Sequence, residues 1–194
     1  MTPTITIGTL DARHRRPIEE IVRATAVFNQ DEVGVALELF DEAMSAARDD
    51  ARPESSTPDS KPNADYEFIG AFDGDTLVGY ACYGATPSTD RTYDLYWIAV
   101  HPDAQRSGTG GTLMAEVERR LDARHARLMV VETSSREDYA RTRSFYHNLG
   151  YAEAARLRDF YAPGDDRVIL SKRLTGSRDP GGNAAARPLP NVGI

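Results

Sequence analysis

The chain has 194 residues, 40% of them hydrophobic, which is enough for one domain with a full core, or for one domain with tails. Its formal net charge of −7 at pH 7 argues against a general nucleic-acid binder, because such proteins neutralise phosphates with Lys and Arg. The single cysteine, Cys82, excludes an internal disulfide and a cysteine-based zinc cluster, and its apolar neighbours predict a buried side chain.

The first third of the sequence predicts a strand and two helices. Thr4 to Gly8 alternates like a short strand and stops at glycine. A first helix is indicated by Ile18, Ile21, Val22 and Val27. Asp31 is the predicted N-cap of a second helix, whose apolar stripe consists of Val35, Leu37, Leu39, Phe40 and Met44. Residues 48–63 contain no apolar residue larger than alanine, and this composition predicts a flexible loop within one domain.

Strands dominate the middle of the chain. Residues 66–72 and 76–83 are predicted to form a β-hairpin joined by an Asp-Gly turn, and residues 92–100 a strand that ends at His101-Pro102. An amphipathic helix follows, with its apolar face formed by Leu113, Met114, Val117 and Leu121.

The last third predicts a strand, a helix and a final hairpin. Residues 127–132 form a continuous apolar run, typical of a strand that is covered on both faces. Residues 137–149 predict a helix that Gly150 ends, and residues 151–157 and 167–174 predict two closing strands. Residues 175–194 are rich in Gly, Pro, Asn and Ala and predict a disordered tail.

A glycine-rich turn joins the strand at residues 92–100 to the helix that follows it. The turn is Gln105-Arg106-Ser107-Gly108-Thr109-Gly110-Gly111, and its bare backbone N–H groups at a helix N-terminus favour a phosphate or pyrophosphate. A Walker loop would need a lysine after the glycines, and a dinucleotide loop would need a third glycine where Leu113 stands. Neither pattern fits this turn.

Two motifs resemble the GCN5-related N-acetyltransferase (GNAT) family. One is Gln105-x-x-Gly108-x-Gly110 after the strand and His-Pro, and the other is Phe145-Tyr146-x-x-Leu149-Gly150-Tyr151. The resemblance implies an α/β (α+β) fold: a twisted, mixed and mostly antiparallel sheet of about seven strands flanked by helices, spanning residues 1–174. Tyr139 and Thr142 depart from the asparagine and alanine that many members carry in the helix before Phe-Tyr.

The resemblance also implies acetyl-CoA as cofactor and a set of site residues. Those expected at the cofactor are Ile98, Val100, Gln105, Arg106, Ser107, Gly108, Thr109, Gly110, Gly111 and Tyr146. Ile98 is expected to lie where a backbone N–H stabilises the oxyanion, and Tyr146 is expected to protonate the departing sulfur. A core aromatic residue is the alternative interpretation of Tyr146.

An amine acceptor must lose a proton before it attacks, and two carboxylates are candidates for the base. Asp94 and Glu132 are both expected near the point where their strands diverge, although a solvated strand-end charge is the alternative explanation of each. Strand alternation predicts that Asp94 shares one face with Tyr96, Ile98 and Val100. His101 and His147 are weaker candidates.

The expected activity is transfer of an acetyl group to a primary amine of a small molecule, such as an amino acid derivative, polyamine or peptide amine. Asp31, Glu32, Asp94 and Glu132 favour such a cationic acceptor. Two alternatives remain open: a protein lysine or N-terminal acetyltransferase, and a non-catalytic acyl-CoA sensor. The expected partners include no nucleic acid, no membrane and no metal, and a homodimer stays open. A cytoplasmic location is expected, because no apolar run follows Arg13 to Arg16.

Overall fold

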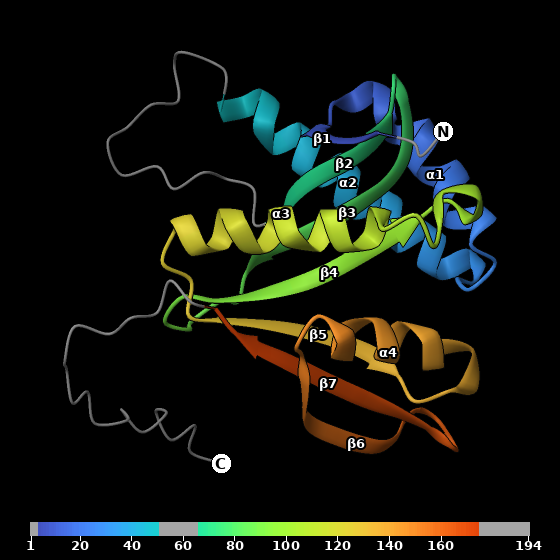
Figure 1. The fold of residues 1–194 in the computed structure, drawn as a ribbon, viewed down its shortest axis with the longest axis vertical. Coiled ribbons are helices and arrows are strands. Elements are labelled where there is room, and N and C mark those ends of the chain that lie inside the picture. Colours follow the sequence, from blue (N-terminus) through green and yellow to red (C-terminus); the bar gives the residue numbers. More distant parts are fainter. Residues whose placement is uncertain (1–3, 51–65, 175–194) are drawn as a thin grey trace.

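The structure is a computed structural model that describes residues 4–50 and 66–174 (Figure 1). Within them the chain forms one seven-stranded sheet in the order β1-β2-β3-β4-β5-β7-β6. The strands are β1 (Ile5–Thr9), β2 (Glu67–Asp73), β3 (Thr76–Ala85), β4 (Thr92–Val100), β5 (Leu128–Ser134), β6 (Ala152–Ala162) and β7 (Asp165–Arg173). The helices are α1 (Arg15–Ala24), α2 (Gln30–Asp50), α3 (Thr109–Ala123) and α4 (Ala140–Asn148), with short 3-10 turns η1 (Ala12–His14), η2 (Pro102–Ala104) and η3 (Glu137–Tyr139).

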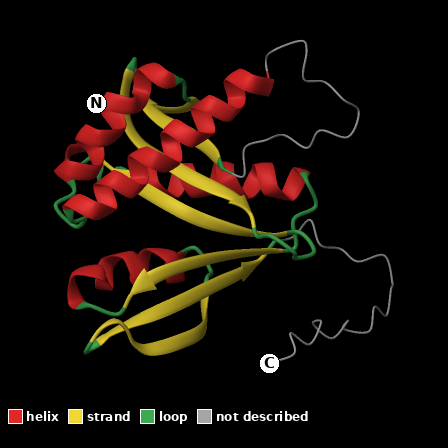
Figure 2. Ribbon diagram, turned by 180° about the vertical axis from the view of Figure 1, so that it is seen from behind, coloured by secondary structure: helices red, strands yellow, loops and turns green. Residues whose placement is uncertain are grey.

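Helices cover the two faces of the sheet unequally. On one face, α3 packs across β1 to β4 and α4 lies over β5 and β7; on the other face, α1 and α2 cover only the half that contains β1 to β4 (Figures 1 and 2). Every strand pair is antiparallel except β4 with β5, which is parallel. The predicted mixed, mostly antiparallel sheet and the order of its elements are confirmed.

The central strand and helix match their predictions. β4 occupies residues 92–100, and α3 buries the whole predicted stripe of Leu113, Met114, Val117 and Leu121. The hairpin between β2 and β3 turns at Gly74-Asp75, where Gly74 adopts a φ of 59° that glycine tolerates without strain. Cys82 is fully buried in β3, as predicted.

Three predictions about the helices need correction. α1 ends at Ala24, so Val27 lies outside it. The N-cap of α2 is Asn29, not Asp31: Asn29 Oδ1 accepts the Glu32 N–H at 2.9 Å, and a Glu32 carboxylate oxygen accepts the Asn29 N–H at 2.7 Å, which is a capping box. The buried stripe of α2 begins at Val33 instead of Val35, which is 48% exposed.

The predicted loop and tail fall mostly outside the described residues. α2 continues to Asp50, so the first three residues of the predicted loop at 48–63 are helical, and residues 51–63 lie outside the described ranges. The predicted tail at 175–194 also lies outside them. In the part of the chain that is described, no helix combines the length and the apolar character needed to cross a membrane.

The strands of the last third differ from prediction in exposure and length. β5 was predicted to be covered on both faces, but Leu128 and Val130 are only half-buried and Glu132 is exposed, because none of the described helices covers the second face of this half of the sheet. β6 and β7 are longer than predicted and meet at a tight turn of Pro163 and Gly164. Strand β6 forms the edge of the sheet and is exposed along its whole length.

Candidate functional site

Strands β4 and β5 pair over a short stretch and then separate. Their parallel register runs from Thr92 with Leu128 to Leu95 with Val131 and stops there. Beyond it, β4 continues with β3 on its other side, while β5 continues with β7 (Figure 1). The facing edges of β4 and β5 therefore diverge, and the cavity described below lies against the free end of β4.

A β-bulge at Tyr96 changes which way β4 points its side chains. Cys82 pairs with Trp97 and Tyr83 pairs with Leu95, so Tyr96 is an extra residue. As a result, Leu95 and Ile98 lie in the same hydrophobic cluster beneath α3 and α4, whereas Trp97 lies in the cluster beneath α1 and α2. Such an insertion shifts the two-residue alternation by one position.

The bulge corrects the predicted position of Asp94. Tyr93 and Leu95, its neighbours, both pack toward the α3 side of the sheet, so Asp94 points toward the opposite face. Ile98 and Val100 point toward the α3 side. Asp94 therefore does not share a face with Ile98, as simple alternation predicted.

The glycine turn is held open by local hydrogen bonds and two left-handed residues. Gly108 is the N-cap of α3 with a φ of 89°, and Arg106 has a φ of 63°. The Ser107 hydroxyl donates to Ala104 O at 2.7 Å and lies 2.8 Å from the Thr109 hydroxyl. The Gln105 side-chain amide donates to Val100 O at 3.1 Å, which ties the turn to the end of β4.

A cavity of about 400 Å³ lies between this turn, the end of β4 and helix α4. All the residues predicted to bind the cofactor line it except Ser107, whose hydroxyl bonds to its own turn. The lining residues are Ile98, Ala99, Val100, Gln105, Arg106, Gly108, Thr109, Gly110, Gly111, Arg141, Thr142, Phe145 and Tyr146. The structure thus gathers two distant motifs around one space.

Helix α4 adds a cationic residue that the sequence analysis missed. Arg141 lines the cavity, so two arginines, Arg106 and Arg141, border it along with the N-terminus of α3. Arg141 precedes Phe145 by four residues, and this spacing on a predicted helix could have indicated that both share one face. Positive charge and free N–H groups make this end of the cavity suitable for phosphates.

Tyr146 lies at the inner side of the cavity and is only 3% exposed. Its ring packs edge-on against Phe145, with ring centroids 5.2 Å apart, and against Tyr151, at 5.7 Å. Burial raises the pKa of the Tyr146 phenol well above its ordinary value. The phenol is therefore neutral at physiological pH and has a proton to donate.

The two candidate bases lie on the same face of the sheet, one on each of the two diverging strands. Asp94 accepts a hydrogen bond from the Thr86 hydroxyl at 2.6 Å, one residue before the register ends. Glu132 is exposed, one residue after the register ends, and accepts the Tyr161 hydroxyl at 2.5 Å. Neither carboxylate lines the cavity.

The start of α2 lies near Tyr139, the residue that precedes α4. Burial and, secondarily, the Glu32 carboxylate raise the pKa of the Tyr139 phenol. Glu32, at the start of α2, therefore lies near Tyr139. The weaker candidates bind locally: His101 accepts the Asp103 N–H at 3.3 Å, and His147 lies 3.0 Å from Tyr151 O.

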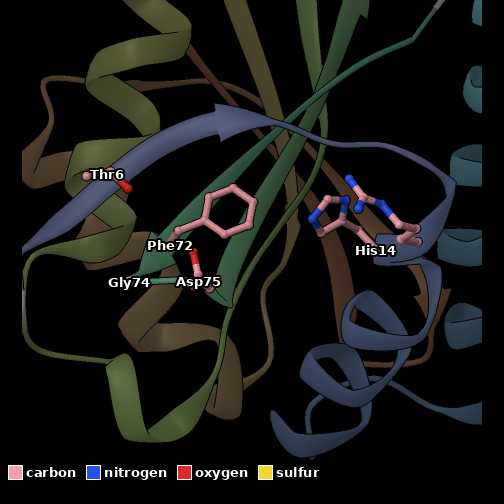
Figure 3. Close-up of a pocket in the computed structure, with 6 residues that line it drawn as sticks. Thr6, His14, Phe72, Gly74 and Asp75 are labelled. Carbon is pink, nitrogen blue, oxygen red and sulfur yellow. The ribbon is translucent and has the colours of Figure 1, made fainter.

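A second hollow, of about 470 Å³, lies on the far edge of the sheet beside β1 (Figure 3). Its lining residues are Thr6, Arg13, His14, Phe72, Gly74 and Asp75. Both basic residues of this hollow, Arg13 and His14, are already bound to Asp11, and none of the predicted site residues lines it. We therefore place the site at the glycine turn.

Comparison with known proteins agrees with this choice. The model of the Acetyltransferase (GNAT) family matches residues 35–151. N-alpha-acetyltransferase RimI of Mycobacterium tuberculosis is 31% identical over 143 residues, covering 72% of this chain and 83% of that protein. A putative GNAT acetyltransferase from Desulfovibrio desulfuricans is 37% identical with a TM-score of 0.75, covering 88% of this chain and 98% of that one. The yncA protein of Salmonella typhimurium, solved with its cofactor acetyl-CoA, shares the fold at 18% identity and a TM-score of 0.65, covering 93% of this chain and 99% of that one.

Proposed function

Because this chain belongs to the GNAT acetyltransferase family, we propose that it transfers the acetyl group of acetyl-CoA to the α-amino group of a peptide or protein N-terminus. The observation that carries this acceptor is the 31% identity with N-alpha-acetyltransferase RimI, over most of both chains. The sequence alone favoured a small-molecule amine, which becomes the alternative that the experiment below tests.

The cavity supports acetyl-CoA as the donor. The N–H groups at Gly108 and Gly110 and the guanidinium groups of Arg106 and Arg141 suit the pyrophosphate, and the apolar walls at Ile98, Val100 and Phe145 suit the pantetheine arm. We place the thioester of this donor where β4 and β5 diverge. The yncA structure supports the same donor, because it contains acetyl-CoA on the same fold.

Residues near the place where β4 and β5 diverge act at successive steps of the reaction. The acceptor nitrogen attacks the thioester carbon and forms a C–N bond, and the backbone N–H at Ile98 stabilises the negative charge on the carbonyl oxygen. The C–S bond then breaks, and the thiolate takes the proton of the Tyr146 hydroxyl. The attacking nitrogen gives one proton to water and the Tyr146 phenolate takes one back from water, so the products are the amide and free coenzyme A, and protons and charge balance.

The acidic side chains near the opening suit an amine. Glu132 and Asp94 lie on the face opposite α4, and Glu32 at the start of α2 lies near Tyr139. An α-amino group has a reference pKa of about 7.7–8.0, so roughly a tenth of it is neutral at pH 7, against less than a thousandth of a lysine with a pKa of ~10.4. A peptide N-terminus therefore needs a weaker base than a lysine, which fits an exposed carboxylate.

The test measures acetyl-CoA consumption with matched acceptors. A peptide with a free N-terminus and no lysine is compared with the same peptide carrying an N-terminal acetyl cap, with a capped peptide that contains lysine, and with polyamines and free amino acids. We expect turnover only with the free N-terminus. Turnover of small amines with a lower KM than the peptide would overturn the proposed acceptor and restore the small-molecule alternative.

A further inference from the structure

Near its end, strand β6 has a large bulge. This bulge lies beside the face of the sheet that α1 and α2 leave uncovered. Leu157 pairs with Arg167 and Ala162 pairs with Asp165, so residues 158–161 of β6 stand opposite the single residue Asp166 of β7. Asp159 has a φ of 52°, its N–H donates to Asp166 Oδ1 at 3.1 Å, and its carboxylate accepts the Gly164 N–H at 2.6 Å. These bonds fix the shape of the bulge.

The bulge places two aromatic side chains over a charged pair on the neighbouring strands. The Phe160 ring lies over the Arg167 guanidinium, with 4.9 Å between the guanidinium carbon and the ring centroid. Tyr161 donates its hydroxyl to Glu132 Oε1 at 2.5 Å. Arg167 forms an ion pair with the other oxygen, Glu132 Oε2. Residues from β5, β6 and β7 thus converge on a single carboxylate.

Among the residues that the structure describes, each oxygen of Glu132 therefore has one partner. A carboxylate has about four lone-pair positions, so one on each oxygen stays available to another donor such as an ammonium group. The side chain of Glu132 is still 37% exposed, and that of Arg167 is 33% exposed. An exposed glutamate would otherwise sample several rotamers, and holding it in one geometry costs side-chain entropy that these two partners offset.

Other charged and titratable groups border this face from each neighbouring strand. Asp94 of β4 lies across the diverging strands, and Asp165 of β7 is buried and accepts the Ser134 hydroxyl at 2.5 Å. Within the described residues, Arg167 is the cation that bonds to Glu132, and its Nε is buried without a hydrogen-bond partner. The Arg167 guanidinium thus pairs with Glu132 through a terminal nitrogen.

We propose that Arg167 and Tyr161 are positioning residues that hold the Glu132 carboxylate at the opening between β4 and β5, where it binds the ammonium form of the acceptor. Phe160 covers Arg167 from the solvent side and restricts its movement. This inference rests on the proposed function, since it assigns the acceptor end of that reaction. Both residues act through Glu132, so their loss changes acceptor use and leaves the cofactor cavity intact.

The experiment compares Arg167→Met, Arg167→Lys and Tyr161→Phe with a matched control, Arg156→Met. Arg156 lies on the neighbouring strand β6 and, like Arg167, forms ion pairs, with Glu153 at 2.9 Å and Asp166 at 3.2 Å; its side chain is 39% exposed. With acetyl-CoA saturating, Arg167→Met should lower kcat/KM for the acceptor by up to about 10²-fold, mainly through KM, because a carboxylate displaced by an ångström loses its alignment. Arg167→Lys should recover part of the loss, and Tyr161→Phe should show a smaller loss.

Unchanged acceptor KM in both Arg167→Met and Tyr161→Phe would overturn the inference, as would an equal loss in Arg156→Met. Calorimetry on the enzyme–CoA complex separates this result from the proposed function, because it requires no turnover. The parent should bind a peptide with a free N-terminus more tightly than its acetylated form, and Arg167→Met should lose that preference. A parent that shows the preference but acetylates no amine would contradict the proposed function and support the inference; no preference in the parent would overturn the inference.

Discussion

Tyr146 keeps its proton over the pH range in which an amine acceptor loses its own. Burial disfavours the phenolate, so the pKa of Tyr146 lies above the value of about 10 for a free phenol. The acid is therefore present below pH 10 and is lost only at still higher pH. An alkaline limb in the activity profile below pH 10 has to come from another group.

The first prediction concerns a variant that lacks only the Tyr146 hydroxyl. Tyr146→Phe keeps the ring that packs against Phe145 and Tyr151, so the affinity for acetyl-CoA should hold, while kcat should fall by roughly 10²-fold, as is typical of a lost general acid. Initial rates and calorimetry on the same preparation measure the two effects. A variant with full turnover would show that Tyr146 only packs.

The second prediction concerns Gly108 and Gly110, which act by different means. A side chain at Gly108 meets no atom within 4 Å but would adopt a φ of 89°, whereas a Cβ at Gly110 would lie 3.4 Å from the Phe145 ring. Gly108→Val should strain the turn and weaken acetyl-CoA binding strongly, and Gly108→Asn should weaken it less, because asparagine tolerates positive φ. Gly110→Val should weaken binding by filling the cavity next to Phe145.

Calorimetric titration with acetyl-CoA measures both effects on folded protein. Gly34→Ala in α2 is the matched control, because a side chain there meets nothing within 4 Å and the helix gains stability by up to about 1 kcal/mol. Parent-like affinity in both valine variants would remove the glycine turn from the cofactor site.

At the scale of elements, the start of α2 depends on one reciprocal pair of hydrogen bonds. Asn29→Ala should lower the free energy of unfolding by about 1 kcal/mol, because it removes the side-chain acceptor for the Glu32 N–H. Asp31→Ala is the control: Asp31 lies in the first turn and contributes only a few tenths of a kcal/mol through the helix dipole. Urea denaturation measures the free energy of unfolding of both variants. A larger loss of stability in the Asp31 variant would identify Asp31 as the N-cap.

Local patterns were enough to predict most elements. The strand, turn and helix around Gly108 and the β2–β3 hairpin depend on residues close in sequence, so β4, α3 and the cavity-lining turn were predictable. The bulges at Tyr96 and at residues 158–161 were not predictable. Tyr96 is one more aromatic residue in a strand-like run, and residues 158–161 contain no glycine or proline, so nothing local shows that either segment leaves the regular ladder.

The same limit explains the misplaced candidates. Asp94 was assigned to the wrong face because its partner strand, not its own sequence, reveals the extra residue. The apolar run in β5 indicated burial on both faces, but burial depends on helices elsewhere in the chain, and no helix in residues 4–50 or 66–174 lies over the face that carries Glu132. Arg167 and Tyr161 were missed since their contact with Glu132 requires three strands to meet.

At the scale of the whole molecule, two hydrophobic clusters hold the fold together unequally. The cluster beneath α3 and α4 runs from Ile69 in β2 to Leu170 in β7 and joins the two halves of the sheet, whereas the cluster beneath α1 and α2 lies only in the first half. The direct pairing between the halves is limited to four residues each of β4 and β5. The cavity lies between these halves, since β4 lines it on one side and α4 on the other.

A ligand in that cavity should therefore bridge the halves. At a concentration of 100 times Kd, acetyl-CoA should raise the free energy of unfolding by about 2.7 kcal/mol. Hydrogen exchange should slow at the end of β4 and in α4, and hardly change in β1 at the far edge of the sheet. Equal protection of β1 and α4 would mean that the ligand stabilises the fold without bridging its halves.

The single thiol of the chain provides a practical advantage for measuring this reaction. Cys82 is fully buried and burial raises its pKa, so a thiol-reactive dye has neither access to the sulfur nor a thiolate to attack. Coenzyme A released by acetyl transfer should thus be counted directly by such a dye, without background from the native protein. After denaturation the same dye should label one site per chain, and its reaction rate in native buffer then reports how often β3 is exposed by unfolding.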